Sequence, residues 1–590
     1  MNERNEPTAT AATNIEESTG VFSADTDNTE LFYRAWLPQQ NQLRRARILI
    51  HRGHEHSGRL EEFAKTLAGP DTGVFSFDMR GHGHSPGRRG DARDFHQWVE
   101  DLDAFVRFVT SQHQLREQDL GIIASSVGAV VATTWVHDYG AKISGMVLAA
   151  PAFSINLYVP LALPALRGAH KLGARPFLKS YVRPAMLTSD AAQATAYAED
   201  PLITKDIGSH LLTTLDNAAK RIIADAAAIR VPTMVLSAGR DAVVRSGPQR
   251  QFFDNLGSEH KQWIDLPDAK HAVFHETDRL AIYDQCQAFL ETCETRPTRA
   301  TPEPSPHTVA EFERLKQRPG HPLKAIGFAI QRLSMKTLGR LSDGISLGWK
   351  AGFDSGETLD YVYRNQAQGK TILGRWIDRA YLDSVGWQGI RDRGDLVRNA
   401  LRDEIAKRPG QKLRIVDLAT GGGRYVLEAL DAPHASNHEV LLRDWSEGSL
   451  TQARSLANQL GLEDITFEKA DALDADSVAG VGQADILLVS GLYELFPDNA
   501  PIEESLRGIA QALKPGGTLI YTCQPWHPQV EMIARVLSNR NGEPWIMRRR
   551  TQPEMDDLVE HAGLTKQRTQ TEPYGIFTVS TAIKTKEARA

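Results

Sequence analysis

The sequence predicts an α/β fold with two doubly wound, largely parallel sheets. Its 590 residues are enough for two or three domains. Short apolar runs alternate with helix-like stretches in both halves, and this alternation is typical of parallel sheets covered by helices. Two of the runs lead directly into turns of small residues, around Ser126 and Gly421, and each turn is followed by a helix-like stretch. Turns of this kind carry the functional groups of many α/β proteins.

The composition excludes several classes of protein. A hydrophobic content of 41% with 24% charged residues is ordinary for a globular chain, and a net charge of −6 gives no basic field for nucleic acid. The cysteines, Cys286, Cys293 and Cys523, have neither CxxC nor metal-ligand spacing, so we expect a reducing compartment and no metal. The N-terminus lacks the apolar core of a secretory signal, and no apolar run is long enough to span a bilayer. We therefore expect a cytoplasmic protein.

The first half begins with a polar stretch, residues 1–16, that we expect to be disordered. Residues 21–36 alternate around Asp25–Asn28, which predicts a β-hairpin. A helix is expected over residues 94–111. Besides the run that begins at Gly121, buried strands are expected at residues 46–51, 73–78, 143–150 and 231–237.

The turn around Ser126 has the layout of a nucleophile elbow, the G-x-S-x-G turn that raises a serine above a parallel sheet. The turn is strained, so the residues two positions to either side must be small; here they are Ala124 and Gly128. Ser126 would be the nucleophile. The alternative is that a turn of small residues serves only packing.

Two later residues complete a catalytic constellation. Asp241 follows a strand, and His271 lies in a loop before a helix. The order Ser126, Asp241, His271 is that of a serine hydrolase triad, in which the histidine takes the serine proton and the aspartate orients the imidazole. Singly, a loop aspartate is more often a turn former and a histidine more often solvated.

Residues 17–292 resemble the monoacylglycerol lipase and lysophospholipase branch of the α/β-hydrolases. The matching motifs are HxGxEHSGR (51–59), FDMRGHGHSPG (77–87), the elbow, GRD (239–241) and KHAVFHE (270–276). The resemblance implies hydrolysis of lipid-like carboxylic monoesters and an oxyanion hole made by the amides of Gly53 and Val127. Arg52 and Ala124 stand where this branch usually has glycine, which changes the walls of the site. A serine nucleophile argues against epoxide hydrolase or dehalogenase chemistry.

Residues 152–228 interrupt the alternation and are expected to form a cap over this site. Their first part, Leu157–Leu166, is almost wholly apolar. Pro160 and Pro164 should prevent one regular helix from hiding that surface. The segment would then line an acyl-chain tunnel. The alternatives are the cap's own core and a dimer contact.

A proline-rich linker is expected over residues 293–322, followed by a helical extension over 323–408. Residues 325–341 place Ile326, Ile330 and Leu333 at helical spacing among lysine and arginine. A cationic amphipathic helix of this kind can lie on anionic lipid, which would give a peripheral membrane contact. More often such a helix packs on its own domain.

Residues 409–590 are expected to form the second sheet. A strand ends at Asp417 and leads into a glycine-rich turn and a helix, which marks a nucleotide-binding crossover. The next strand ends at Asp444, where an acid can bind the ribose hydroxyls of an adenosine. Asp471 follows a third strand and is placed to read the adenine amine. An NAD site would need a further glycine where this chain has Val426.

This second half resembles the class I S-adenosylmethionine-dependent methyltransferases, through the LKPGG turn at 513–517 and a late hairpin at 563–569 and 576–582. The resemblance implies S-adenosylmethionine as the cofactor. It places the binding site at Asp417, Ala419, Gly421, Gly423, Asp444 and Asp471. Candidates for the acceptor side are Tyr361, Tyr363, Tyr493 and Glu494, although aromatic residues at helical spacing are usually core.

The whole chain resembles bacterial fusions of an α/β-hydrolase with such a methyltransferase, and we expect a bifunctional enzyme. The alternative is that one half is a degenerate binding or regulatory module, given Arg52 and Ala124 in the hydrolase half. The sequence names neither the ester nor the methyl acceptor, and it leaves the oligomeric state open.

Overall fold

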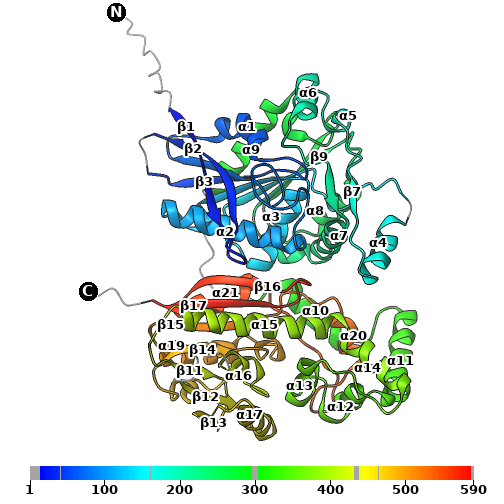
Figure 1. Ribbon diagram of the computed structural model, residues 1–590, viewed down its shortest axis with the longest axis vertical. Coiled ribbons are helices and arrows are strands. Elements are labelled where there is room, and N and C mark those ends of the chain that lie inside the picture. The colour runs from blue at the N-terminus through cyan, green and yellow to red at the C-terminus, as the bar shows by residue number, and fades with distance from the viewer. Residues whose placement is uncertain are drawn as a thin grey trace, which may run out of the picture. The chain divides into compact units, whose positions relative to one another are not determined.

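The computed structural model describes residues 14–39, 42–159, 161–294, 303–430, 438–462 and 464–585. The chain forms two compact units, and the division falls between helix α9 (Arg279–Glu294) and helix α10 (Pro306–Lys316) (Figure 1). Each unit contains its own sheet.

The first unit is built on an eight-stranded sheet with the order β1-β2-β4-β3-β5-β6-β9-β10. The pairs β1–β2 and β2–β4 are antiparallel, and all the other pairs are parallel. The central strands are buried throughout, as their continuous apolar runs predict. The strands are β1 (Ile15–Ser23), β2 (Glu30–Pro38), β3 (Arg45–Ile50), β4 (Thr72–Phe77), β5 (Leu120–Ser125), β6 (Gly145–Ala149), β9 (Thr233–Ala238) and β10 (Lys261–Leu266).

Helices connect these strands, and a separate group of elements forms the cap between β6 and β9. The helices of the main layer are α1 (Glu61–Leu67), α2 (Phe95–His113), α3 (Val127–Tyr139), α8 (Ser246–Asn255) and α9. The cap contains α4 (Ala162–Lys171), α5 (Pro184–Leu187), α6 (Ala191–Glu199), α7 (Ser209–Ala224) and the antiparallel pair β7 (Phe177–Lys179) and β8 (Asp206–Gly208).

Three expectations for this unit need correction. Residues 1–13 lie outside the described residues, but Ile15 and Glu16 already belong to β1, so the predicted disordered tail extends too far. Strand β10 was not predicted, because this edge strand is only half-buried and carries polar residues. Pro164 does not prevent a helix: it lies in the first turn of α4, where its missing N–H is not needed. Pro160 lies outside the described residues.

The second unit is built on a seven-stranded sheet with the order β13-β12-β11-β14-β15-β17-β16. The first five strands in this order are parallel, and β17 is antiparallel to both β15 and β16. The strand order reverses direction between β11 and β14, which is where doubly wound sheets open a crevice for ligands. The strands are β11 (Arg414–Asp417), β12 (Glu439–Asp444), β13 (Ile465–Lys469), β14 (Ala484–Val489), β15 (Leu513–Cys523), β16 (Leu564–Thr571) and β17 (Thr578–Lys584).

The helices of this unit fall into an N-terminal group and a group between the strands. The first group is α10, α11 (Pro322–Thr337), α12 (Asp343–Ala351), α13 (Gly356–Arg364), α14 (Ile372–Leu382) and α15 (Val385–Ala406). The second group is α16 (Arg424–Leu430), α17 (Glu447–Gln459), α18 (Ala475–Ala479), α19 (Ala500–Ala512), α20 (Val530–Val536) and α21 (Gln552–His561). In the part of the chain that the structure describes, no helix combines the length and hydropathy needed to cross a bilayer.

Helix α10 lies within residues 293–322, which were predicted to form a linker. Thr308, Phe312 and Leu315 are buried along one of its faces, and Leu315 packs against Val530 and Ala534 of α20. Its buried residues have helical spacing, but the three prolines shortly before it and Pro306 at its start favoured an extended interpretation.

Candidate active sites

Ser126 occupies the turn between β5 and α3. Its φ of 53° lies in the left-handed region, which L-residues rarely adopt and which is found at strained functional turns. A β-carbon at Gly128 would lie 2.5 Å from the carbonyl oxygen of His51, so only glycine fits that position. Ala124, two residues before the serine, is fully buried in β5. The turn therefore has the predicted elbow geometry with alanine in place of its first glycine.

The three predicted triad residues meet at the carboxyl ends of the strands. Nε2 of His271 lies 2.9 Å from Oγ of Ser126, and its Nδ1 lies 2.8 Å from Oδ2 of Asp241. The other carboxylate oxygen of Asp241 accepts the backbone N–H groups of Val243 and Val244, at 2.7 and 2.9 Å. These bonds fix the carboxylate, so Oδ2 faces the imidazole. The arrangement can transfer a proton from the serine hydroxyl to the histidine.

A cavity of about 620 Å³ opens beside Ser126 and His271. Most of its wall comes from the cap, and its lining is largely apolar. The segment singled out in the sequence contributes Leu157, Val159, Ala162, Ala165 and Leu166 to this wall. None of the described residues of α4 is buried in a core, so this segment lines the cavity instead of forming the cap's own core.

Gly53 and Val127, the residues predicted to form the oxyanion hole, line the same cavity. A β-carbon at Gly53 would lie 3.2 Å from Cγ2 of Val127, so the two residues are close neighbours. Arg52 also reaches this cavity. Its guanidinium lies 2.5 Å from Glu55 and 5.3 Å from the ring centre of Tyr197 in the cap. The ion pair opposes the effect of burial and lowers the pKa of Glu55 below its usual range.

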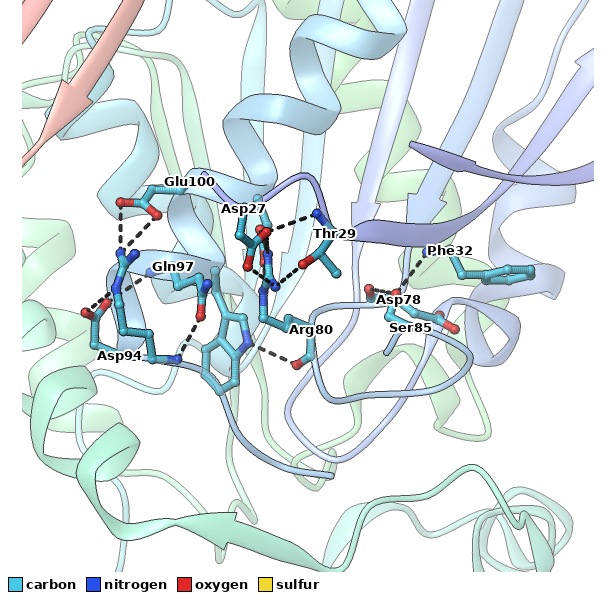
Figure 2. A network of polar contacts seen from close by, with 12 residues as sticks. Asp27, Thr29, Phe32, Asp78, Arg80, Ser85, Asp94, Gln97 and Glu100 are labelled. Carbon is cyan, nitrogen blue, oxygen red and sulfur yellow. Dashed lines mark hydrogen bonds and ion pairs between the residues drawn. The ribbon is translucent and has the colours of Figure 1, made fainter. Parts of the chain in front are cut away.

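The loop after β4, which carries the FDMRGHGHSPG motif, is held by a polar network (Figure 2). Arg80 donates to Asp27 at 2.8 Å and to Asp101 at 2.9 Å, and its carbonyl oxygen accepts the indole N–H of Trp98 at 3.2 Å. Ser85 donates to the carbonyl oxygen of Asp78 at 2.6 Å. Because Trp98 lines the cavity, this network supports the wall of the site.

In the second unit, the glycine-rich turn follows β11. Gly421 and Gly423 have φ values of 54° and 70°, where glycine is strongly preferred. A β-carbon at Gly423 would lie 3.1 Å from Leu427, whereas the space around Gly421 is open toward the crevice. Asp444 accepts the N–H of Gly421 at 2.9 Å and therefore supports the turn as well as facing the crevice.

The crevice at this edge of the sheet is a cavity of about 460 Å³. It brings together five of the six predicted cofactor residues: Ala419, Gly421, Gly423, Asp444 and Asp471. Asp417 does not line it but is wholly buried behind the turn. Within the described residues neither of its carboxylate oxygens has a hydrogen bond of standard geometry. Burial raises the pKa of Asp417 to about 7, against the opposing effect of the Tyr425 and Thr420 hydroxyls.

These features fit S-adenosylmethionine. Open glycines let a ligand approach the backbone, and the acids at the ends of β12 and β13 face the crevice. The buried Asp417 carboxylate offers a negative charge to a cationic group.

The four residues predicted as candidates for the acceptor side lie in different environments: two are packed in the core, and two line cavities. The Tyr361 hydroxyl donates to the buried Asp378, and the Tyr493 hydroxyl lies 2.9 Å from Oγ of Ser505 in the core. Among the described residues that line the crevice and the cavity next to it, neither tyrosine is found. Tyr363 lines the crevice beside the glycine-rich turn. Glu494 lines a neighbouring cavity and pairs with Arg393 at 3.2 Å. Arg393 was missed, because an arginine within a long helical pattern gives no sequence signal of a site.

Comparison with known proteins matches the two halves of the chain to two different families. A family model described as "Putative methyltransferase" matches residues 287–584, half of the chain. The chain belongs to this family. A second model, described as "Serine aminopeptidase, S33", matches residues 41–278 of this methyltransferase-family chain. YnbC of Escherichia coli K12, described as an uncharacterized protein, is 44% identical over 575 residues, which cover 95% of this chain and 98% of YnbC.

The hydrolase half of this family member has lipase-like relatives. The monoacylglycerol lipase of Mycolicibacterium smegmatis is 24% identical over 45% of this chain and 95% of that protein. Human monoglyceride lipase is 27% identical over 42% of this chain and 86% of its own length. A crystal structure of a soluble monoglyceride lipase variant from Saccharomyces cerevisiae matches with a TM-score of 0.42 and 19% identity, covering 50% of this chain and 100% of that one. A lipase-like hydrolase domain is thus joined to a methyltransferase-family domain.

Proposed function

We propose that the first unit is a serine hydrolase of carboxylic esters with apolar acyl groups. The observation that carries this proposal is the hydrogen-bonded chain Ser126–His271–Asp241 beside an apolar cavity. In the proposed reaction, Oγ of Ser126 attacks the ester carbonyl while Nε2 of His271 takes its proton. The protonated histidine then gives that proton to the leaving alcohol. A water molecule then attacks the acyl group on Ser126 while His271 takes its proton, and the histidine returns that proton to Oγ as the carboxylic acid leaves.

Two further features support this assignment. Gly53 and Val127 line the same cavity as Ser126, and we propose that their backbone amides hold the developing oxyanion. The apolar wall contributed by α4 suits an acyl chain, since each buried methylene adds roughly 0.8 kcal/mol of binding free energy. We therefore propose monoacylglycerol- or lysophospholipid-like esters as the substrate class.

We also propose that the second unit transfers a methyl group from S-adenosylmethionine. When bound, the cofactor supplies an electrophilic methyl group on sulfur. Gly421 and Gly423 would let it approach the backbone, and Asp444 and Asp471 would orient its adenosine part. The buried Asp417 carboxylate would stabilise the positive charge of its amino group.

The competing proposal is that one unit has lost its chemistry and serves as a binding or regulatory module. Arg52 and Ala124 are the residues that favour it, because both stand where the lipase branch that this half resembles usually has glycine. Turnover of p-nitrophenyl octanoate decides between the two for the first unit, with the Ser126→Ala variant as control. Calorimetric titration with S-adenosylmethionine decides for the second. Absence of turnover in the unmodified chain would favour the regulatory role.

We propose that the second unit makes a peripheral membrane contact through helix α11. On α11 the side chains of Leu323, Ile326, Ile330 and Leu333 are 55–71% exposed at helical spacing, and Lys336 beside them is also exposed. An apolar stripe flanked by basic residues fits the surface of anionic lipid. Co-sedimentation with phosphatidylglycerol vesicles should be lost in the Ile330→Asp variant. Equal binding by that variant would contradict the contact.

A further inference from the structure

A second cavity in the methyltransferase-family unit, of about 330 Å³, lies next to the cofactor crevice. Parts of α11, α12, α13, α14, α15 and α20 line it, together with the segment after β15. Its body is apolar and aromatic. Lining side chains include Met335, Tyr381, Trp387, Ile390, Trp545 and Phe577.

This cavity and the cofactor crevice share a wall. Asp354, Leu359, Arg393, Gly491, Leu495 and Trp545 line both of them. A molecule in the apolar cavity would therefore meet a cofactor in the crevice across these residues. That is the position required of a methyl acceptor, because the transferred group moves directly from donor to acceptor.

Nitrogen donors line the cavity. Among the described residues, the amide nitrogen of the buried Gln524 and the indole nitrogen of the buried Trp545 have no hydrogen-bond partner. Buried donors of this kind normally have a partner, which an acceptor atom of a bound ligand would supply here. Because Trp545 lies on the shared wall, the partner of its N–H would lie close to the cofactor.

His527 adds a third donor. Its Nδ1 accepts the backbone N–H of Gln529 at 3.0 Å, and burial beside Arg549 lowers the pKa of His527 to about 3. The ring is therefore neutral and carries its proton on Nε2. Together with the Arg393 guanidinium, these groups supply hydrogen-bond donors to an otherwise apolar cavity. Such donors fit a group that only accepts hydrogen bonds.

The acids in the lining do not offer a free base. Glu494 is paired with Arg393 at 3.2 Å, and Asp354 accepts the backbone N–H of Arg540 at 2.6 Å and lies 3.2 Å from its guanidinium. A hydroxyl or ammonium acceptor must lose a proton before or during methyl transfer, which requires a base. A carboxylate is already deprotonated at neutral pH, so it needs none.

We propose that this cavity binds the methyl acceptor, and that the acceptor is a carboxylic acid with an apolar body. The inference rests on the methyltransferase function proposed above. A carboxylate oxygen forms a bond to the methyl carbon, the carbon–sulfur bond breaks, and its electron pair stays on sulfur. The products are a methyl ester and S-adenosylhomocysteine, and no proton is transferred. The acid released by the proposed esterase reaction belongs to the same chemical class.

Binding of the acceptor can be tested on the full chain without cofactor. We expect [1-¹³C]dodecanoate to give a bound carboxyl resonance by NMR that disappears in two variants. Gln524→Leu removes a donor that lines only this cavity, and Ile390→Trp fills its apolar part. Gln483→Leu, at an exposed glutamine elsewhere in the unit, is the matched control and should keep the resonance. Any resonance from the hydrolase cavity should persist in all of these proteins.

Methyl transfer is then measured by mass spectrometry in the Ser126→Ala background, which removes ester hydrolysis. We expect methyl dodecanoate to form and Gln524→Leu to slow its formation at least about tenfold while S-adenosylmethionine still binds. Methylation of dodecylamine or 4-octylphenol in place of the acid would overturn the proposal. The proposal would also be overturned if the bound carboxyl resonance persisted unchanged in both Gln524→Leu and Ile390→Trp. Loss of cofactor binding in the unmodified chain, with the resonance intact, would instead refute the methyltransferase function and leave the carboxylate site.

Discussion

His271 and Ser126 are separated by 145 residues in the chain, yet Nε2 of the histidine lies 2.9 Å from Oγ of the serine. Removing either partner, or the Asp241 carboxylate, should abolish ester hydrolysis. We expect Ser126→Ala, His271→Ala and Asp241→Asn each to reduce kcat for p-nitrophenyl octanoate on the order of 10⁴-fold, because triad residues act as a unit. Circular dichroism should show that the fold survives. Normal turnover by Ser126→Ala would refute the assignment.

The apolar wall formed by α4 should set the preferred acyl length. We expect kcat/KM to rise from acetyl to octanoyl esters, and Ala169→Trp to lower the value for octanoyl at least about tenfold while acetyl turnover is largely kept, since each lost methylene contact costs roughly 0.8 kcal/mol. Ala169 lines the cavity. Leu172→Trp is the control, because Leu172 is 88% exposed and does not line the cavity. If kcat/KM stayed constant from acetyl to octanoyl esters, the proposed lipid-like substrate class would be refuted.

The Asp417 pKa of about 7 predicts proton release when the cofactor binds. At pH 6 the folded chain holds this carboxyl mainly protonated, whereas the amino group of S-adenosylmethionine is already cationic. Binding that positive charge should ionise Asp417 and release up to about one proton. Titration calorimetry in two buffers of different ionisation enthalpy measures this number. Asp417→Asn should release none, and an equal release by that variant would contradict the role.

The same raised pKa has a consequence for stability. Between the unfolded value of 3.8 and the folded value of about 7, the folded state binds more protons than the unfolded state. This carboxyl therefore makes the free energy of unfolding decrease as pH rises through that range. Asp417→Asn should make the decrease shallower in chemical denaturation of the cofactor-free protein between pH 4 and 7.

Helix α10 should be part of the smallest stable methyltransferase fragment. It buries Phe312 and Leu315, and Arg549 lies 2.6 Å from Glu311 on the same helix. We expect residues 303–590 to fold and bind S-adenosylmethionine, and residues 323–590 to be less stable by at least about 3 kcal/mol, because two buried apolar side chains lose their packing. Thermal unfolding of the two fragments measures the difference. Equal midpoints would mean that α10 contributes nothing.

Arg80 should matter for stability far more than exposed arginines do. Its partner Asp101 is 1% exposed, so Arg80→Met would leave a buried carboxylate without its cation, at a cost of about 3–5 kcal/mol. Arg116→Met is the matched control: its pair with Asp119 is 72% exposed on the arginine side and should be worth less than about 1 kcal/mol. The stability of both variants can be measured from the urea concentration at which hydrolase activity is lost. Similar midpoints would show that the network does not support the fold.

Much of this protein was determined by local sequence. The continuous apolar runs predicted the buried strands, since a strand covered on both faces has no polar alternation. The turns around Ser126 and Gly421 were recognisable because strained or left-handed backbone restricts the residues that fit it. Helix α10 and strand β10 were missed because a proline-rich approach and a polar edge strand mask their short apolar patterns.

Only the tertiary structure decided which side chains meet. It placed Leu157, Val159, Ala162, Ala165 and Leu166 on the wall of a cavity, a choice that apolar composition alone left open. It also separated Tyr361 and Tyr493, which are packed in the core, from Glu494, which pairs with Arg393 at a cavity. The unpartnered donors of Gln524 and Trp545 have no sequence signature at all. Whether a buried polar group has a partner depends on residues far away in the chain, so no local pattern encodes it.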